Sequence, residues 1–354
     1  MSKTAVVFSS VYYKHNTGKK HPESAKRLGI IVNELKKGKL SKSKNWQFVK
    51  PTKASIADVR LVHDYQYIRF IESICKSGGD ILDVGDTVAS PESYEVALYA
   101  VGGTLKAVDL IMEKHFENAF ALVRPPGHHA EKFRAMGFCI FNNVAIAAKY
   151  LLEKFGLERI AILDIDAHHG NGTQRTFYET NKVLYISIHQ DPRDFPGTGF
   201  INEVGQEDGL GYTVNIPLPF RTNDHIYLKA LQEIVTPIIN EYKPEFLLIS
   251  AGLDGHYADP VGELSLSMLC YQKIFDEIVE IASKICDGKI VSVLEGGYSL
   301  RFVGKIAAVA VARMSNTPYD ANDKICETGL SVRRRGEKII NSVKKVQRDF
   351  WNLN

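Results

Sequence analysis

The sequence has 354 residues, 45% of them hydrophobic and 24% charged, a composition that is typical of a globular protein. Its formal net charge of +3 is too small to indicate a nucleic-acid partner. Its apolar runs are all shorter than the roughly 20 residues of a membrane span, and the N-terminal apolar stretch is too short for a signal peptide. Five cysteines without CxxC spacing favour reduced thiols, so we expect a cytoplasmic protein.

The pattern of apolar residues predicts one α/β domain over residues 1–354. The segment from Met1 to Phe8 predicts a first strand, and the lysine-rich patch from Lys36 to Lys44 is expected to be a solvated loop. Further along, the predicted helices cover residues 94–113, 144–155, 225–242 and 266–284, and the predicted strands cover residues 119–123, 159–164, 183–188, 212–216, 246–250 and 289–294. Continuous apolar strands alternating with helices indicate a mostly parallel central sheet with helices on both faces.

The C-terminal segment, residues 331–353, predicts a basic helix that contains Arg333, Arg334 and Arg335. The favoured interpretation is a last helix that packs on the domain and exposes a basic face. A nuclear or nucleic-acid signal is the weaker alternative.

Titratable residues follow four of the predicted strands. In open parallel sheets, sites form outside the carboxyl ends of the strands, so these residues are expected at one rim. They belong to the segments that start at Arg124, Asp164, Ser250 and Glu295.

Asp164, Asp166 and His168 are spaced at i, i+2 and i+4, which places all three on one side of an extended chain. Carboxylates and an imidazole on one side form a natural metal site. The same pattern is also typical of a polar strand exit with hydrogen-bonded aspartates. The glycine-rich continuation from His169 to Gly172 favours the metal site, because it lets the backbone turn tightly around an ion.

The other strand-end residues are ambiguous when each is taken alone. Asp254 also fits a turn or a helix cap. Of the adjacent His128 and His129, one also fits a packed core histidine. Tyr298, after Glu295-Gly-Gly, fits either a plain turn or a hydroxyl donor on a flexible loop. Their joint occurrence at strand ends favours a catalytic site.

At this point the sequence resembles the histone deacetylase and acetylpolyamine amidohydrolase family, which has an arginase-like α/β fold. The resemblance runs from about residue 15 to 300. It is carried by His21-Pro22-Glu23 with Arg27 and by the ordered motifs RPPGHHA (124–130), GFCIFNN (137–143), DIDAHHGNGTQ (164–174), FPGTG (195–199), NIPLP (215–219), GLDGHYADP (252–260) and LEGGY (294–298). The RPPGHHA motif and Asn171 are more similar to the class II and bacterial branches than to class I.

The resemblance implies a role for each matching residue. It implies one divalent cation, zinc by family expectation with iron(II), cobalt or manganese as chemical alternatives, and the ligands Asp166, His168 and Asp254. It implies His129 as general base and then acid, His128 as a stabiliser of charge, Tyr298 as transition-state donor, and Asp164 and Asn171 as partners of the two histidines. It implies a slot for an acyl-lysine stem lined by Gly137, Phe138 and Phe195, with Val261 at its gate and Arg27 near its inner end. It also implies a structural potassium ion around residues 164–168 and Ser187.

Several functions remain open on these residues. The substrate that we expect is acetyl-lysine in proteins, and the alternative is an acetylpolyamine or another small acylated amine. An arginase-like two-metal hydrolase needs more central carboxylates than Asp166, Asp254 and Asp164 provide. A non-catalytic acyl-lysine reader is favoured where a ligand, a histidine or the tyrosine is missing, and all are present here. Nothing in the sequence indicates an oligomeric state.

The gate position distinguishes the two substrate classes. Val261 is apolar, whereas a polyamine-preferring relative carries glutamate at this position. We expect the nearby Glu263 and Glu92 to be solvated surface carboxylates. The sequence therefore predicts a preference for acetyl-lysine in exposed peptides over acetylspermidine.

Overall fold

A computed structural model describes residues 4–320 and 322–353; residues 1–3 of the predicted first strand lie outside this range. It contains an eight-stranded sheet in which every neighbouring pair of strands is parallel. The strands are β1 (Thr4–Val7), β2 (Trp46–Val49), β5 (Asn118–Ala121), β6 (Ile160–Asp164), β7 (Val183–Gln190), β8 (Thr213–Leu218), β9 (Phe246–Ala251) and β10 (Ile290–Leu294). Their order is β2-β1-β5-β10-β9-β6-β7-β8, and β3 (Asp80–Ile81) pairs with β4 (Val88–Ala89) in a separate antiparallel hairpin.

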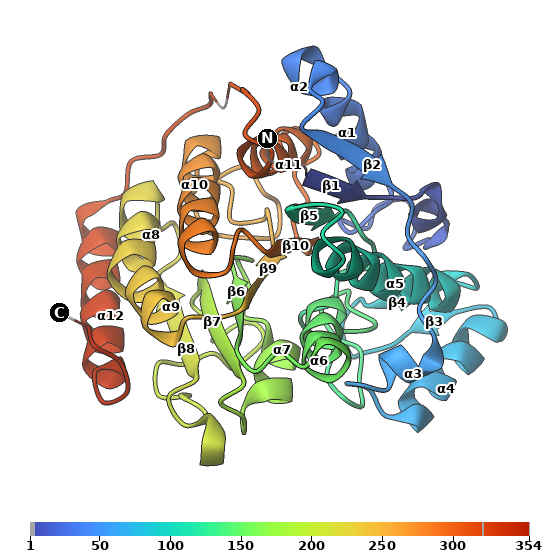
Figure 1. Cartoon of the computed structure of the whole chain (residues 1–354), viewed down its shortest axis with the longest axis horizontal. Coiled ribbons are helices and arrows are strands. Elements are labelled where there is room, and N and C mark those ends of the chain that lie inside the picture. The colour runs from blue at the N-terminus through green and yellow to red at the C-terminus, as the bar shows by residue number, and fades with distance from the viewer. Residues whose placement is uncertain (1–3, 321, 354) are drawn as a thin grey trace.

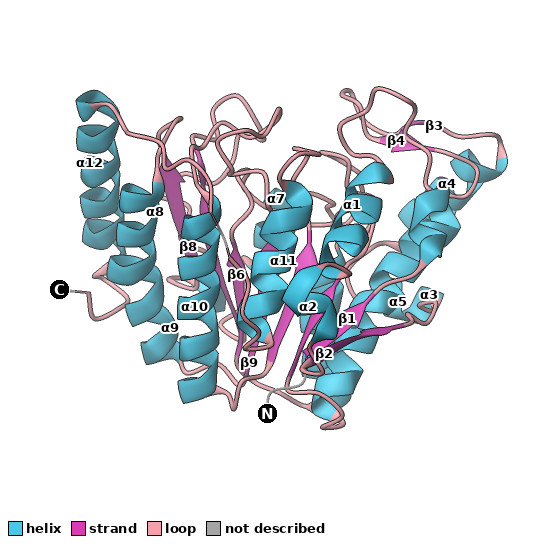
Figure 2. Cartoon of the chain, turned by 90° about the horizontal axis from the view of Figure 1, so that it is seen from above, coloured by secondary structure: helices cyan, strands magenta, loops and turns pink. Residues whose placement is uncertain are grey.

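Helices cover both faces of this sheet (Figures 1 and 2). One layer contains α1 (Lys26–Leu35), α8 (Asp224–Ala230), α9 (Thr236–Tyr242), α10 (Met268–Ile285) and α11 (Val303–Met314). The other contains α5 (Ser93–Met112), α6 (Asn143–Phe155) and α7 (Asn171–Phe177), and α12 (Leu330–Gln347) packs beside the edge strand β8. The short helices α2 (Gly38–Lys42) and α3 (Ile56–Val59) and the longer α4 (Tyr65–Lys76) complete the N-terminal part. The α/β fold class predicted from the sequence is therefore confirmed.

All six strands predicted after residue 100 form, and their ends move by at most two residues. These strands are buried along their whole length, which is why they stand out as continuous apolar runs. The helix predicted over residues 225–242 also forms, as α8 and α9 joined by the π-helical segment η3 (Leu231–Val235).

Two of the predictions were wrong in detail. The expected loop from Lys36 to Lys44 contains the short helix α2, because Leu40 is buried and its carbonyl accepts a hydrogen bond from the Trp46 indole at 2.8 Å. The last helix ends at Gln347 and does not reach residue 353. Its continuation turns back, and the Trp351 indole donates to the carbonyl of Gly211 at 2.8 Å.

The four strands that carry the titratable residues, β5, β10, β9 and β6, are neighbours at the centre of the sheet. Because parallel strands end at the same edge, the segments after Val123, Leu294, Ala251 and Asp164 meet above the middle of the sheet. The four segments therefore lie together at one edge of the sheet, as the sequence predicted. Among the described residues, no helix combines the length and the apolarity that crossing a membrane requires.

Candidate active site

The ends of β6 and β9 bring together two carboxylates and one imidazole. Ligand atoms of Asp166, His168 and Asp254 all lie within 4.8 Å of one another, and all three side chains are buried. The Nδ1 atom of His168 lies 3.2 Å from Oδ1 of Asp166 and 3.1 Å from Oδ2 of Asp254. These are the three residues that the family resemblance implied as ligands, and the structure brings their ligand atoms together.

The surrounding backbone fits a cation held by this set. The backbone N–H of Gly296 donates to Oδ2 of Asp166, and that of Ala167 donates to Oδ1 of Asp254, each at 2.9 Å. A Cβ atom on Gly296 would lie 2.5 Å from Oδ2 of Asp254 and 2.7 Å from Oδ2 of Asp166, so only glycine allows the backbone to approach both carboxylates. The two aspartates are thus oriented from behind before any ion is present.

Asp166 and Asp254 are buried close together, so their negative charges repel each other and are poorly solvated. Burial and the neighbouring Asp166 raise the pKa of Asp254 to about 7. Burial also opposes the ionised form of Asp166, but His128 and His168 outweigh it and hold the pKa of Asp166 below its ordinary value. Two carboxylates with one imidazole are donors that zinc takes in catalytic sites, and a divalent charge would balance both aspartates. The residues present therefore fit the expected ion.

The histidine pair sits on the turn after β5, with ring centroids 4.0 Å apart. Nδ1 of His128 lies 3.0 Å from Oδ2 of Asp164. Burial disfavours a charged His128, but Asp164 and Asp166 outweigh burial and raise its pKa to about 10. Burial and the neighbouring His128 and His168 hold the pKa of His129 well below its ordinary value. The environment thus favours a charged His128 beside a neutral His129.

Asn171 determines which nitrogen of His129 carries the proton. Its Nδ2 donates to Oε1 of Glu131 at 2.8 Å, so its Oδ1 is the atom that faces Nδ1 of His129, also at 2.8 Å. Nδ1 of His129 must therefore donate, which leaves the lone pair on Nε2. Glu131 was missed from the sequence, although it follows the histidine pair by only two residues.

Tyr298 is held from both its backbone and its ring. Its N–H donates to Oδ2 of Asp259 at 2.7 Å, and the Arg27 guanidinium carbon lies 4.9 Å from the centre of its ring. The preceding Gly297 has φ +113°, a conformation that favours glycine. Burial raises the pKa of Tyr298 well above its ordinary value, so the hydroxyl stays a donor. Asp259 was the second residue that the sequence did not reveal.

Arg27 is buried beneath this loop. Its Nε donates to the carbonyl of Gly297 and its NH2 to the carbonyl of Glu295, each at 2.6 Å. Its NH1 donates to Oε1 of Glu23 at 3.2 Å. The structure thus places Arg27 behind Tyr298 and not on the wall of the cavity described next, and a contact between Arg27 and substrate stays a prediction.

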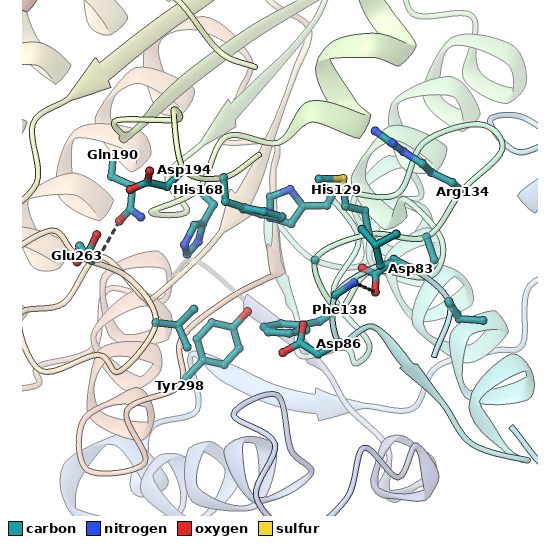
Figure 3. Close-up of a pocket in the computed structure, with 18 of the residues that line it drawn as sticks. Asp83, Asp86, His129, Arg134, Phe138, His168, Gln190, Asp194, Glu263 and Tyr298 are labelled. Atoms are coloured by element: carbon teal, nitrogen blue, oxygen red, sulfur yellow. Dashed lines mark hydrogen bonds between the residues drawn. The ribbon is translucent and has the colours of Figure 1, made fainter. Parts of the chain in front are cut away.

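A cavity of 660 Å³ opens above these groups, and His129, His168 and Tyr298 lie at its inner end (Figure 3). Gly137, Phe138, Phe195 and Val261, the predicted slot residues, all line it. The Phe195 ring packs edge-on against His129, with centroids 4.9 Å apart, and the Phe138 ring packs edge-on against Tyr298 at 5.6 Å. The cavity wall is thus aromatic down to His129 and Tyr298.

The rim of this cavity is acidic. Asp83, Asp86, Asp194 and Glu263 line it, against the single guanidinium of Arg134 among the described lining residues (Figure 3). The backbone N–H of Glu263 donates to Oε1 of Gln190 at 2.7 Å, which fixes Glu263 beside Val261. Glu263 is exposed, as expected of a surface carboxylate, and it also lines the cavity. Glu92, by contrast, directly precedes α5 and does not line the cavity.

Comparisons with known proteins agree with this geometry. The family described as "Histone deacetylase domain" matches residues 21–314. A "Probable deacetylase" of Archaeoglobus fulgidus is 46% identical over 98% of this chain and 98% of its own length. A "Histone deacetylase-like amidohydrolase" of Pseudomonas aeruginosa is 33% identical over 77% of this chain and 71% of its own length.

A solved structure described as "Crystal Structure of HDA15 HD domain" has the same fold, with a TM-score of 0.88 and 31% identity. The match covers 99% of this chain and 95% of that one. The fold, the family match and the near full-length similarity to a relative lead to one conclusion: the chain belongs to the histone deacetylase family of deacetylases.

Proposed function

We propose that this protein is a zinc-dependent hydrolase that removes the acetyl group from acetyl-lysine in proteins. The observation that carries the proposal is the convergence of His168, His129 and Tyr298 at the inner end of one aromatic cavity. Asp166, His168 and Asp254 would hold the cation. When bound, a zinc ion supplies Lewis-acid chemistry, polarising an acyl carbonyl and lowering the pKa of water toward 7.

The chain's own residues would perform the proton transfers. His129 Nε2 carries a lone pair, because Nδ1 donates to Asn171, so His129 can take a proton from the attacking water. The same nitrogen can return that proton to the leaving lysine amine. His128, held by Asp164, would stabilise negative charge from the opposite side.

Tyr298 would donate its hydroxyl to the oxyanion that develops on the acetyl carbonyl. Burial keeps this hydroxyl protonated, and the Arg27 guanidinium and Asp259 hold its loop in place. A donor of this kind typically contributes about 10²–10³ in rate. Loss of the Tyr298 hydroxyl alone should therefore slow the chemical step while substrate still binds.

The aromatic wall supports a lysine stem as the group that enters. Phe138 and Phe195 line the cavity between the rim and His129. Burying each methylene of a lysine stem contributes about 0.8 kcal/mol. The stem would supply affinity and alignment, and the carbonyl would reach the catalytic groups.

An acetylated polyamine is the second candidate, and the acidic rim is the observation that favours it. Its remaining cations would face Asp83, Asp86, Asp194 and Glu263. An exposed ion pair contributes at most about 1 kcal/mol, or about fivefold in selectivity. The apolar Val261 at the gate keeps acetyl-lysine as the first candidate.

The remaining expectations concern the protein's surroundings. We infer a location in the cytoplasm from its five free cysteines, and we expect no partnership with membranes or nucleic acid. A structural potassium ion could use the backbone around Asp164 and the hydroxyl of Ser187, which is paired in register with Asp164.

The test compares zinc-loaded protein on an acetyl-lysine peptide and on acetylspermidine. We expect a higher kcat/KM for the peptide and no turnover with the Asp166→Ala variant. A preference for acetylspermidine above about tenfold, worth ~1.4 kcal/mol, would replace the first candidate with the second. Absence of turnover on both substrates would contradict the proposal and favour an acyl-lysine reader.

A further inference from the structure

A second group of metal-binding atoms lies beside the first. A ring nitrogen of His128, the Sγ atom of Cys139 and a carboxylate oxygen of Glu295 lie within 4.8 Å of one another, and all three side chains are buried. We name this group the His–Cys–Glu cluster. It shares no residue with Asp166, His168 and Asp254, so it is not one half of a binuclear centre with bridging carboxylates.

One oxygen in this cluster lacks a partner. Oε2 of Glu295 accepts hydrogen bonds from the backbone N–H groups of Gly127 at 2.6 Å and His128 at 3.2 Å. Oε1 is buried and has no hydrogen-bond partner within the described part of the chain. Buried carboxylate oxygens nearly always have a partner, so this oxygen has an unused acceptor position. Oε1 is therefore the oxygen that is free to take a ligand.

We propose that the His–Cys–Glu cluster is a second zinc site, and that its occupation inhibits the enzyme. An imidazole, a thiolate and a carboxylate are a donor set that zinc takes, whereas magnesium and calcium require oxygen ligands. The thiolate of Cys139 and the carboxylate of Glu295 together balance the charge of one divalent ion. The ion and its three ligands would together be neutral.

This second site is the weaker of the two. Zinc must displace the proton of the Cys139 thiol, and burial raises the pKa of that thiol well above its ordinary value. The site of Asp166, His168 and Asp254 contains no thiol, and the backbone N–H groups of Gly296 and Ala167 already orient both of its carboxylates. The first equivalent of metal therefore fills the catalytic site, and only excess metal enters the His–Cys–Glu cluster.

Inhibition is expected because His128 belongs both to the His–Cys–Glu cluster and to the proposed active site, and this part of the inference rests on the proposed function. His128 is held by Asp164, and its Nε2 lies 3.9 Å from Oδ2 of Asp166. A histidine whose lone pair binds zinc can no longer carry a proton or a full positive charge beside the reaction. We expect excess zinc to lower turnover by about tenfold or more, because such groups contribute 10² or more to rate.

Cobalt(II) distinguishes the two sites by their colour. A cobalt–thiolate bond gives an intense charge-transfer band in the near ultraviolet, and the catalytic ligands include no thiolate. The metal-free full-length protein is titrated with cobalt(II) while its absorption and bound metal are recorded. We expect no band with the first equivalent and a thiolate band with the second.

Variants assign the band to its residue. Cys139→Ser should lose the band, the second equivalent and the inhibition by excess zinc, and should keep the first equivalent. Cys326→Ser, which changes a less buried cysteine, is the matched control and should keep all of them. Circular dichroism of each variant checks that the fold is retained.

The outcomes separate this inference from the proposed function. A wild-type protein that binds one equivalent without a thiolate band overturns the second site, even if acetyl-lysine is turned over normally. A band that survives in Cys139→Ser also overturns it. A second equivalent with a thiolate band but unchanged turnover overturns the inhibition. A second equivalent and band in a protein that turns over no acetylated amine supports the site and contradicts the proposed function.

Discussion

Replacing Glu23 by glutamine should destabilise the protein and remove part of its sensitivity to acid. The Glu23 carboxylate is fully buried and accepts hydrogen bonds from Arg124 at 2.6 and 2.8 Å and from Arg27 at 3.2 Å. Burial disfavours its ionised form, but Arg124, His15 and Arg27 outweigh burial and lower its pKa from 4.5 to about 2. This depression corresponds to about 3 kcal/mol of stability in favour of the folded protein.

The sign of the pH dependence follows from that direction. Because the pKa of Glu23 is lower in the folded chain, its contribution is complete above the unfolded value of 4.5 and is lost as the pH falls toward 2. Glu23→Gln should therefore lower the free energy of unfolding by about 3 kcal/mol at neutral pH, where it leaves Arg124 without a buried counter-charge. Below about pH 4 the difference between variant and wild type should shrink.

Urea unfolding of both proteins, at neutral pH and at about pH 3.5, measures these differences. Glu280→Gln is the matched control, because Glu280 is 61% exposed and pairs only with Lys284 among the described residues; it should change stability by less than about 0.5 kcal/mol. A difference between Glu23→Gln and wild type that stays constant from neutral to acidic pH would refute the electrostatic reasoning.

Three further predictions concern the active site. Tyr298→Phe should retain substrate binding and lower kcat by about two orders of magnitude, and a near-wild-type kcat would remove its hydroxyl from the mechanism. His129→Ala should lower kcat more than His128→Ala, because His129 carries the proton to the leaving amine; equal losses measured side by side would contradict that division. The double change Asp194→Asn and Glu263→Gln should lower kcat/KM for acetylspermidine about fivefold at low salt and should have little effect on an uncharged acetyl-lysine peptide. An equal loss of kcat/KM on both substrates would show that the charge of the rim does not select the substrate.

The central strands could be predicted because a fully buried strand appears in the sequence as a short run of apolar residues. Each residue of Phe246–Ala251 is buried, so the strand is a continuous apolar run. The edge strand Trp46–Val49 is only half-buried and was not predicted. Helix α1 was also missed, although Leu28, Ile31, Val32 and Leu35 mark its buried face at helical spacing. The end of the last helix depends on a distant contact, from Trp351 to Gly211, which no local pattern contains.

The residues of the candidate active site divide in the same way. The spacing of Asp166 and His168 favoured a metal site but left a polar strand exit as an alternative, whereas the contribution of Asp254 depends on β9 lying next to β6. Glu131 and Asp259 act through hydrogen bonds to Asn171 and to the backbone of Tyr298, across 40 and 39 residues of sequence. Such pairings arise from the tertiary fold, so a single sequence does not reveal them. Family resemblance supplied the ligands but not these supports.

The most direct test of the account follows metal and turnover together. The protein is stripped of metal by chelation and titrated with zinc, and bound zinc and hydrolysis of an acetyl-lysine peptide are measured at each step. We expect turnover to rise with the first bound equivalent and to be complete there. We expect Asp254→Ala to lose both this zinc and the activity while it stays folded. Full turnover by the metal-free protein, or full occupancy of catalytic zinc in Asp254→Ala, would contradict it.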